Sequence, residues 1–591
     1  MLKRVLMALV VVAAALAGVT PASAATSSLS LDQSSYVQGQ TIVASYTAAQ
    51  VSSTNWVGIY KSGQTPGSVA STMWRYAPNA SGSVSFATDS LATGSYVAYL
   101  LYNDGYTVLA GPQPFTVTAP SAGTNLIVNG DAESGDPSTS GYDSVTLPGW
   151  TVTGTPTAVS YSVGAGFPTS STPGPSNRGG AFFAGGPVGS GSLTQTVDVS
   201  SAASQIDGGG VTYSLSGWLG GYAGEMSSAT VKITFQNAGG SSLGTGQIGP
   251  VTASDRGNTT SLLQRAASGG VPSGTRSIAV VVSLTGDPAR DTANKYNDAY
   301  ADSLSLSLTG ASVTPGTLTP PPSSVPGFDH VFFTVLENRA YDQVIGNSAA
   351  PYLTGLAGGN VTLAQSYGVV HPSDPNYMAV AGGSTFGYTS NPFPSDIGKI
   401  NAPHIGDRIE SVGKTWRSYV EDMGTPCNST KNGNYDPDDV PFWFFKDLMP
   451  VGGARCQDKI QPITGLWTDL GTAATTPNFV WFEPNSCNSM HNCDTATGDT
   501  WFRNNMPKIF NSPAWTRQRS LLIITFDEDD DAHAQRIPTI VVGSPGTTRT
   551  GYRSDVHYTH YSMLRTMESA LGLATLTRND KYAVPLNDVW P

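Results

Sequence analysis

The apolar runs "HVFFTVL" (His330–Leu336) and "SLLIITF" (Ser520–Phe526) decide the fold of the C-terminal part of the chain. A third run, "TIVVG" (Thr539–Gly543), follows shortly after the second. Unbroken stretches rich in β-branched and aromatic residues are typical of strands buried on both faces of a sheet. Residues 402–412 and 561–571 read as covering helices. Residues 328–591 are therefore predicted to form an α/β domain with a mostly parallel sheet.

Polar side chains follow two of these strands directly. Glu337 and Asn338 come after the first run, and Asp527 and Glu528 come after the second. Because the carboxyl ends of parallel strands meet at one edge of a sheet, we expect these groups to lie close together. Carboxylate and amide oxygens are hard ligands suited to a divalent cation. The pattern predicts a metal site whose ion is not identified by the sequence, although acids in a surface loop would give the same pattern.

The stretch "HPSDPNY" (His371–Tyr377) holds Ser373 between two prolines. Proline fixes its own φ and biases the residue before it towards extended backbone, so Pro372 and Pro375 predict a rigid turn. A rigid turn can be purely structural, or it can orient the Ser373 hydroxyl as a nucleophile. No Gly-x-Ser-x-Gly stretch occurs within residues 328–591, which disfavours a serine esterase of the acyl-transfer type.

The first half of the chain is predicted to be all-β. Residues 26–118 and 122–310 consist of short alternating runs separated by Gly, Asn, Ser and Pro, which is typical of β-sandwiches. A Pro, Thr and Ser stretch over 311–327 predicts an extended, semi-rigid linker. The aromatic residues of the first sandwich could bind a sugar, but core packing is the favoured interpretation; they include Trp56, Tyr60, Trp74 and Tyr102.

The N-terminus predicts an exported protein. Residues 1–24 combine Lys3-Arg4, an apolar stretch and the small-residue end Ala22-Ser23-Ala24, which is the pattern of a signal peptide. No later stretch has the ~20 apolar residues of a transmembrane helix, so we expect a secreted, extracellular protein without a transmembrane segment.

The four cysteines fit an oxidising compartment and predict two disulfides rather than a metal cluster. Three pairings are formally open to four cysteines. Proximity in sequence favours Cys427 with Cys456 and Cys487 with Cys493.

Charge disfavours a nucleic-acid partner. The net charge is −12, and only 12% of the residues are charged. A surface of this sign does not attract nucleic acid or an anionic membrane through bulk electrostatics. All seven histidines lie beyond the linker, so reactive side chains are concentrated in the C-terminal domain.

The C-terminal domain resembles the phosphoesterase family of secreted acid phosphatases and non-specific phospholipases C, which belongs to the alkaline-phosphatase superfamily. The resemblance extends over 330–573 and is carried by several motifs in order: "VLENRAYDQVIG" (335–346), "HPSDPNYMAVAGG" (371–383), "PNFVWFEPNSCNSMHNCDTATGD" (477–499), "IITFDEDDD" (523–531), "RIPTIVVG" (536–543) and "HYSMLRTMESALGL" (560–573). The resemblance implies an alkaline-phosphatase-like catalytic domain.

The same resemblance implies roles for individual residues. Glu337 and Asn338 match the first metal ligands of the family, and Asp527 with Glu528 match its late acidic pair. Ser373 occupies the position of the nucleophile. A phosphoserine would form there and then be hydrolysed by water.

Other positions of the resemblance concern the substrate and proton transfer. Asn376 lies where the phospholipase branch has Pro-Asn-Arg, and a substrate-binding role is predicted for it. Here Tyr377 replaces the arginine, which favours the acid phosphatase branch. His491, His371 and His404 are candidates to protonate the leaving oxygen or hold phosphate oxygens, with His491 as first choice.

The sequence thus predicts a metal-dependent acid phosphatase that acts on phosphomonoesters, which include phosphoinositide head groups. Two alternatives stay open: a phospholipase C acting on phospholipids, and a wall-binding protein that has no activity.

The β-domains resemble accessory modules. Residues 26–118 are similar to immunoglobulin-like modules, and 122–310 to jelly-roll carbohydrate-binding modules, which implies a polysaccharide ligand. Such modules often hold a structural calcium ion, for which Asp131, Glu133 and Asp302 are candidate ligands, and solvated turn acids are the equal alternative.

Overall fold

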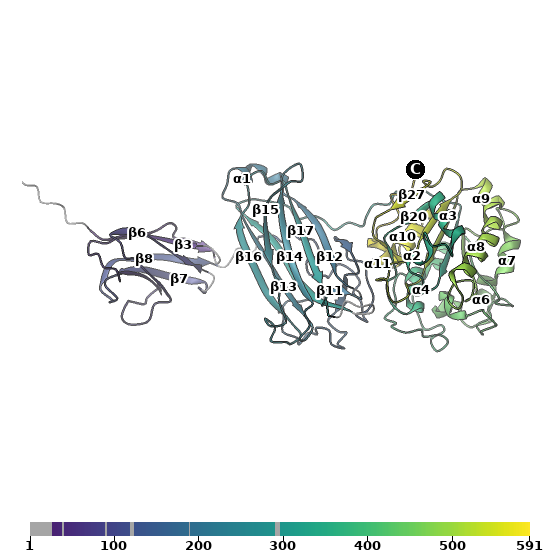
Figure 1. Cartoon of the computed structure of the whole chain (residues 1–591), viewed down its shortest axis with the longest axis horizontal. Helices are drawn as coiled ribbons and strands as arrows, with labels where there is room; N and C mark the ends of the chain where they lie inside the picture. The colour runs from purple at the N-terminus through teal and green to yellow at the C-terminus, as the bar shows by residue number, and fades with distance from the viewer. Residues whose placement is uncertain (1–25, 38–40, 89–90, 119–122, 188, 290–295) are drawn as a thin grey trace, which may run out of the picture. The chain divides into compact units, whose positions relative to one another are not determined.

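The computed structural model describes residues 26–37, 41–88, 91–118, 123–187, 189–289 and 296–591 (Figure 1). The predicted signal peptide, residues 1–24, lies outside the described residues. The chain divides into two compact units, Met1–Ala122 and Gly123–Pro591. The second unit contains a β part followed by an α/β part.

The first unit is a sandwich of two sheets. Alternation of apolar and polar residues builds it: in the strand Thr41–Thr47, the side chains of Ile42, Ala44 and Tyr46 are buried in its core. One sheet has the order β1-β3-β6 and the other β2-β8-β7-β4-β5. The strands are β1 (Ser28–Leu31), β2 (Ser35–Val37), β3 (Thr41–Thr47), β4 (Trp56–Lys61), β5 (Met73–Tyr76), β6 (Ser81–Ala87), β7 (Gly94–Leu101) and β8 (Val108–Thr118).

The β part of the second unit is a sandwich of two five-stranded antiparallel sheets. The first sheet is β10 (Thr157–Ser160), β11 (Ala181–Gly186), β18 (Asn297–Thr309), β13 (Thr212–Gly221) and β16 (Ser261–Gly270). The second is β15 (Ser242–Ile248), β14 (Ser228–Gln236), β17 (Ser277–Thr285), β12 (Gly191–Asp198) and β9 (Thr151–Thr153). A short helical segment, η2 (Ser200–Ala202) and α1 (Ala203–Asp207), follows β12.

The α/β part is built on one eight-stranded sheet, as predicted. In order, its strands are β23 (Ile460–Pro462), β22 (Trp416–Val420), β24 (Phe479–Glu483), β19 (His330–Leu336), β25 (Ser520–Phe526), β26 (Ile540–Gly543), β20 (Val361–Leu363) and β27 (Tyr552–Ser554). All neighbours run parallel except β26, which is antiparallel to both β25 and β20. The fold class expected from the apolar runs is therefore confirmed.

Each central strand is buried on both faces. In β19, Val331 and Phe333 pack into one core while Phe332 and Leu336 pack into another. Helices α4 (Ser373–Gly382), α5 (Ile405–Ser411) and α10 (His560–Leu571) contribute to the first core. Helices α3 (Pro351–Gly359), α7 (Ile463–Asp469), α8 (Thr495–Phe510) and α9 (Pro513–Arg517) contribute to the second. The helices predicted over 402–412 and 561–571 are present as α5 and α10.

The shorter elements complete the α/β part. They are α2 (Tyr341–Val344), β21 (Ser366–Tyr367), η3 (Pro437–Asp439), η4 (Pro441–Phe444), η5 (Lys446–Leu448), α6 (Ala454–Lys459), β28 (Tyr558–Thr559) and α11 (Arg578–Tyr582). No helix in the described ranges has the length and apolar character needed to cross a bilayer.

Two disulfides are present with the predicted pairing. Cys427 is bonded to Cys456, with Cα atoms 5.4 Å apart, and Cys487 to Cys493, with Cα atoms 4.7 Å apart. The first disulfide joins the loop after β22 to α6, and the second closes a short loop after β24.

Residues 312–327 form neither helix nor strand, which fits the predicted linker. Its end nevertheless lies against the α/β part, because Ser324 donates hydrogen bonds to Asn587 and the Asn587 side chain donates to the carbonyl of Pro322.

Candidate active site

Ser373 is the first residue of α4. The sequence predicted a rigid turn here, and the structure shows the start of a buried helix. Pro372 stands in extended backbone before the helix, and Pro375 lies in its first turn. Both positions tolerate proline because the N–H groups of the first turn have no partner inside the helix. The prolines therefore fix where the helix begins, and with it the place of the Ser373 hydroxyl.

The Ser373 hydroxyl meets two predicted ligands. Its Oγ lies 3.1 Å from Glu337 Oε2 and 3.4 Å from Glu528 Oε1. Glu337 directly follows β19, while Glu528 lies two residues after the end of β25, and these two strands are parallel neighbours. The sheet thus brings the two acids to one edge, as the strand pattern indicates, and α4 presents the serine to them.

Asn338 and Asp527 lie beside this pair. The Asn338 N–H donates to Asp527 Oδ1 at 3.0 Å, and Asn338 adopts a left-handed backbone with φ of 53°. Asparagine is among the residues that best tolerate this conformation. Asn338 Oδ1 and Asp527 Oδ2 are buried with no hydrogen-bond partner among the described residues. Buried oxygens without donors are the expected state of cation ligands.

The electrostatics of this cluster also fit a cation. Burial raises the pKa of Asp527 well above its ordinary value, and the charges of Glu337 and Glu528 raise it further. Burial raises the pKa of Glu528 to about 7, although His371 opposes that shift. Carboxylates that crowd one another in this way are stabilised by a positive charge between them. Glu337, Asn338, Asp527 and Glu528 are therefore a suitable donor set for a divalent metal ion.

His371 lies in the same cluster. Its Nδ1 is 2.7 Å from Glu528 Oε2, and its Nε2 is 3.1 Å from Asp529 Oδ1. Burial alone would lower the pKa of His371, but the hydrogen bonds to Asp529 and Glu528 outweigh it and raise the pKa to about 10. The ring keeps 25% of its surface exposed, so it faces solvent at the mouth of the site as an imidazolium.

A second layer of polar groups supports Glu337, and the sequence reasoning missed it. The Tyr377 hydroxyl donates to Glu337 Oε1 at 2.5 Å. Burial, followed by the charge of Glu337, raises the pKa of Asp439 far above its ordinary value, and burial does the same for Glu483. Two signals were available: Tyr377 is four residues after Ser373 on one helix face, and Glu483 ends a strand adjacent to β19.

His560 was also missed. It begins α10, is fully buried, and its Nε2 donates to the carbonyl of Asp527 at 2.6 Å. Burial lowers its pKa to about 4, so the ring is neutral and fixes the backbone that presents Asp527.

Asn376 points away from the acids and binds backbone. Its Oδ1 accepts from the N–H groups of Val369 and Val370 at 2.9 and 3.2 Å. Its Nδ2 donates to the carbonyls of Val370 and Pro372. The amide therefore uses its full hydrogen-bonding capacity to hold the segment before Ser373, and the predicted substrate contact has no free group in this arrangement.

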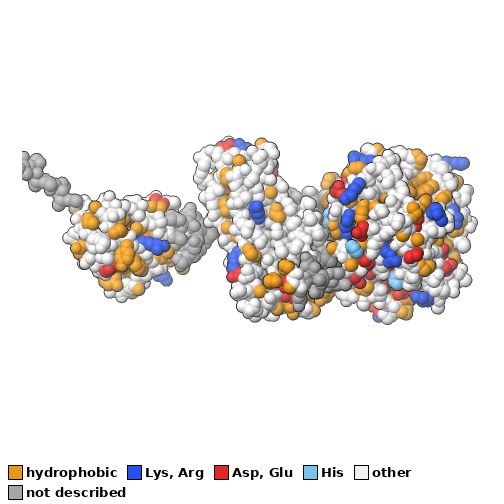
Figure 2. Space-filling model, viewed as in Figure 1, with side chains coloured by type: hydrophobic (Ala, Val, Ile, Leu, Met, Phe, Trp, Pro, Cys, Tyr) orange, Lys and Arg blue, Asp and Glu red, His pale blue; other side chains and the backbone are white. Residues whose placement is uncertain are grey.

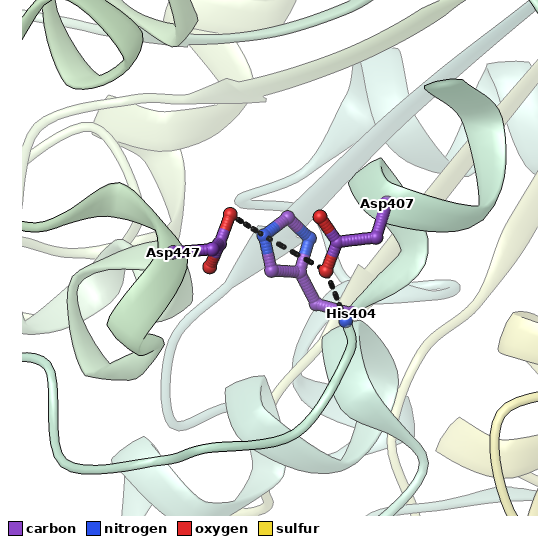
Figure 3. Close-up of side chains that lie close together, drawn as sticks. All are labelled: His404, Asp407 and Asp447. Carbon is purple, nitrogen blue, oxygen red and sulfur yellow. Dashed lines mark hydrogen bonds and ion pairs between the residues drawn. The ribbon is translucent and has the colours of Figure 1, made fainter. Parts of the chain in front are cut away.

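His404 belongs to a different cluster, with Asp407 and Asp447 (Figure 3). The ring is fully buried, its Nδ1 accepts the Gly406 N–H at the start of α5, and its Nε2 lies 3.1 Å from Asp447 Oδ2. The structure does not bring His404 to the acids around Ser373. Within the described residues, no hydrogen bond or ion pair joins the two groups.

His491 is exposed, and its Nδ1 lies 2.9 Å from Asn492 Oδ1. Its loop meets Glu337 through backbone, because the Ser489 carbonyl accepts the Glu337 N–H at 2.9 Å. Of the three predicted histidines, only His371 contacts the acids beside Ser373 in this structure. A catalytic role for His491 stays a prediction.

The predicted calcium ligands of the β part have other partners. Glu133 Oε1 accepts the N–H groups of Gly180 and Ala181, both at 2.8 Å. Asp302 is buried, accepts the Tyr161 hydroxyl at 2.7 Å, and burial raises its pKa to about 7. Asp131 is exposed. Calcium at these acids stays a prediction.

Comparison with known proteins identifies the family of the α/β part. Residues 347–574 match the model of the phosphoesterase family. Over 278 residues the chain is 33% identical to a protein named phosphatidylinositol-3-phosphatase from Mycobacterium tuberculosis, covering 45% of this chain and 85% of that relative. A protein named acid phosphatase from Aspergillus fumigatus is 28% identical over 273 residues, which cover 44% of this chain and 59% of the relative.

Among solved structures, one described as a protein in the alkaline phosphatase superfamily from Vibrio parahaemolyticus aligns with a TM-score of 0.33 and 14% identity, over 44% of this chain and 71% of its own. The identity to the mycobacterial relative over most of its length, together with a family match that includes Ser373, Asp527 and Glu528, shows that this chain belongs to the phosphoesterase family and is a phosphoric ester hydrolase.

Proposed function

We propose that the protein is a secreted acid phosphatase that hydrolyses phosphomonoesters through a phosphoserine at Ser373. The observation that supports this most strongly is the Ser373 hydroxyl held between Glu337 and Glu528 at the end of two adjacent strands. A hydroxyl with acceptors on two sides is oriented and can pass its proton to a carboxylate when it attacks phosphorus.

A divalent cation held by Glu337, Asn338, Asp527 and Glu528 would lower the pKa of the serine hydroxyl and neutralise charge on the phosphate oxygens. The chain's own groups account for the protons. Ser373 Oγ bonds to phosphorus while its proton passes to Glu528, whose other oxygen contacts His371.

The bond from phosphorus to the leaving oxygen then breaks. His371, which is protonated at neutral pH, gives that oxygen its proton. In the second half of the reaction, water attacks phosphorus and the neutral His371 takes a proton from that water. The bond between phosphorus and Ser373 Oγ breaks, and Oγ regains its proton from Glu528. Inorganic phosphate leaves, and all three side chains return to their first state.

A phosphoinositide head group is the second candidate substrate. The mycobacterial relative carries the name phosphatidylinositol-3-phosphatase, and a phosphoinositide presents a phosphomonoester on a sugar-like ring. Secretion is supported by the signal-peptide pattern of residues 1–24 and by the two disulfides.

The first unit offers a surface for the proposed polysaccharide ligand. Trp74, Tyr76 and Tyr106 are each about half exposed (51%, 47% and 54%) and surround the buried Trp56. Rings that are apolar on their faces and polar at one end suit the faces and hydroxyls of sugars. Charged side chains are sparse on the face of this unit drawn in Figure 2. A Trp74→Ala, Tyr106→Ala variant should lose retention on an insoluble cell-wall glycan, and unchanged retention would exclude this surface.

The central experiment compares three substrates with and without chelator: a phosphomonoester, a phosphodiester and phosphatidylcholine. The proposal expects chelator-sensitive release of phosphate from the monoester only. Cleavage of phosphatidylcholine to diacylglycerol would identify a phospholipase C instead, and no turnover on any substrate, with metal bound, would contradict both.

A further inference from the structure

The helix that carries Ser373 is held at both ends by one loop of the β part. This loop, residues 138–146, is called the clamp loop here. It precedes β9 and lies against the α/β part, within the same compact unit. The linker composition predicted two domains joined by a spacer, and the contacts of the clamp loop instead reach the catalytic helix.

The first contact lies just before the helix. The Ser144 N–H donates to the carbonyl of Val369 at 2.8 Å. On its other side, the Val369 N–H donates to Asn376 Oδ1, which belongs to α4 itself. The segment that leads into Ser373 is thus fixed between the clamp loop and its own helix. Ser144, Val369 and Asn376 are all buried, so water does not compete for these bonds.

The second contact lies just after the helix. Thr385 Oγ1 donates to Asp143 Oδ2 at 3.0 Å, and both residues are buried. The side chain of Asn579, also buried, joins the two parts as well. Its Nδ2 donates to the carbonyl of Gly383 at 3.1 Å, and its Oδ1 accepts the N–H of Thr146 at 3.2 Å.

The clamp loop is itself fixed to the β part. Asp143 Oδ1 accepts hydrogen bonds from the hydroxyls of Ser138 and Ser140. Thr157 in β10 donates its hydroxyl to the Asp143 carbonyl at 2.8 Å and accepts the Val145 N–H at 3.1 Å. A loop anchored to a strand in this way can hold a second element in place rather than follow its motion.

We propose that the clamp loop positions α4, and therefore Ser373, so that the β part is a working component of the catalytic unit and not only an attached binding module. The inference rests on the proposed function of Ser373. Thr385 and Asn579 act as positioning residues through α4 and do not touch substrate. A nucleophile displaced by ~1 Å can lose roughly a hundredfold in rate, so these contacts bear on turnover.

The test uses the full chain with the substitutions Thr385→Val and Asn579→Ala, which remove the side-chain bonds at the end of α4 and leave the loop intact. The matched control is His557→Phe. His557 Nε2 donates to the Gly154 carbonyl of the β part at 2.9 Å, and its ring stacks on Tyr367, so phenylalanine removes one bond between the same two parts and keeps the stacking.

Two readouts are measured: kcat and KM on a small phosphomonoester, and amide hydrogen exchange over residues 369–385. The double variant should remain folded, exchange faster over that segment, and lose roughly tenfold or more in kcat with little change in KM. The His557→Phe control should match the wild type in its kinetic constants and in its hydrogen exchange over residues 369–385. Unchanged exchange, or faster exchange with unchanged kcat, would overturn the proposal. If the wild type hydrolyses no phosphomonoester, the proposed function fails, and the exchange data alone still decide whether the loop holds the helix.

Discussion

The clusters around His404 and around Ser373 each combine a histidine with carboxylates, and they differ in how their charge is balanced. Around His404, the guanidinium of Arg455 contacts Asp407 and Asp447 at 3.0 Å each. Burial raises the pKa of Asp447, but His404 and Arg455 outweigh it and hold that pKa below its ordinary value. Around Ser373, the corresponding pKa values are raised.

We infer from this difference that the charge balance around a set of ligands, besides their types and spacing, bears on whether they hold a metal ion. The His404 cluster contains its own permanent cation, Arg455, whose guanidinium contacts the carboxylates of Asp407, Glu410 and Asp447. Among the described residues, the Ser373 cluster has His371 as the basic side chain in contact with its acids, and it holds two buried oxygens without donors, Asn338 Oδ1 and Asp527 Oδ2. Under the proposed function, a shortage of positive charge distinguishes the proposed metal site from the His404 cluster, and the predictions below test that distinction.

The largest effect is expected for Ser373→Ala. Because the substitution removes the attacking oxygen and leaves Pro372 and Pro375 in place, folding should survive while kcat falls roughly a thousandfold or more. Ser418→Ala is the matched control, since Ser418 is a buried serine in β22 whose hydroxyl has no hydrogen-bond partner among the described residues. It should retain wild-type turnover. Equal turnover in the two variants would assign Ser373 a structural part only.

The second prediction compares the clusters directly. Asp527→Asn should reduce bound metal, measured by elemental analysis after dialysis, and lower turnover by roughly a hundredfold. Asp447→Asn should keep metal and turnover but lower the melting temperature by about 2–4 °C, because it weakens contacts to His404 and Arg455 worth about 1 kcal/mol. Loss of metal in the Asp447 variant and not in the Asp527 variant would reverse the assignment.

The third prediction concerns the buried carboxyl of Glu568, which lies 4.0 Å from the guanidinium of Arg565. Burial and the neighbouring Asp580 together raise the pKa of Glu568 to about 10, although the charges of Arg565 and Arg408 oppose that shift. In the unfolded chain the pKa of Glu568 is near its ordinary value of 4.5. Between these values the folded chain binds one more proton than the unfolded chain, so stability falls as pH rises, by about 1.4 kcal/mol per pH unit.

Glu568→Gln removes that dependence. Its melting temperature should therefore exceed that of the wild type by a margin that grows from pH 5 to pH 9. A constant difference across this range would show that Glu568 does not carry the extra proton.

The sequence predicted the sheet well because the signals are local. Runs such as His330–Leu336 are buried on both faces, and the parallel pairing of β19 with β25 follows from that composition. Glu337 and Glu528 could be expected to meet because each lies at the end of such a strand. The disulfide pairs followed from proximity in the chain.

The other features depend on long-range packing. His404 lies in a separate cluster, where its ring contacts Gly406 and Asp447 and where Arg455 contacts both neighbouring acids, and residue type alone does not indicate these partners. The structural role of Asn376 could not be predicted from the sequence, because its hydrogen-bond partners are backbone groups and every residue type offers those. The clamp loop contacts α4 across more than two hundred residues, and nothing in the linker composition indicates it.

The central claim is that Ser373 attacks phosphorus. The most direct test is to mix enzyme with a phosphomonoester, quench in acid within a turnover, and locate phosphate by mass spectrometry of the peptides. The account predicts phosphate on Ser373, acid-stable and absent without substrate. Multiple turnovers with no phosphate on Ser373 at any quench time would contradict it, because direct attack by water never labels the enzyme.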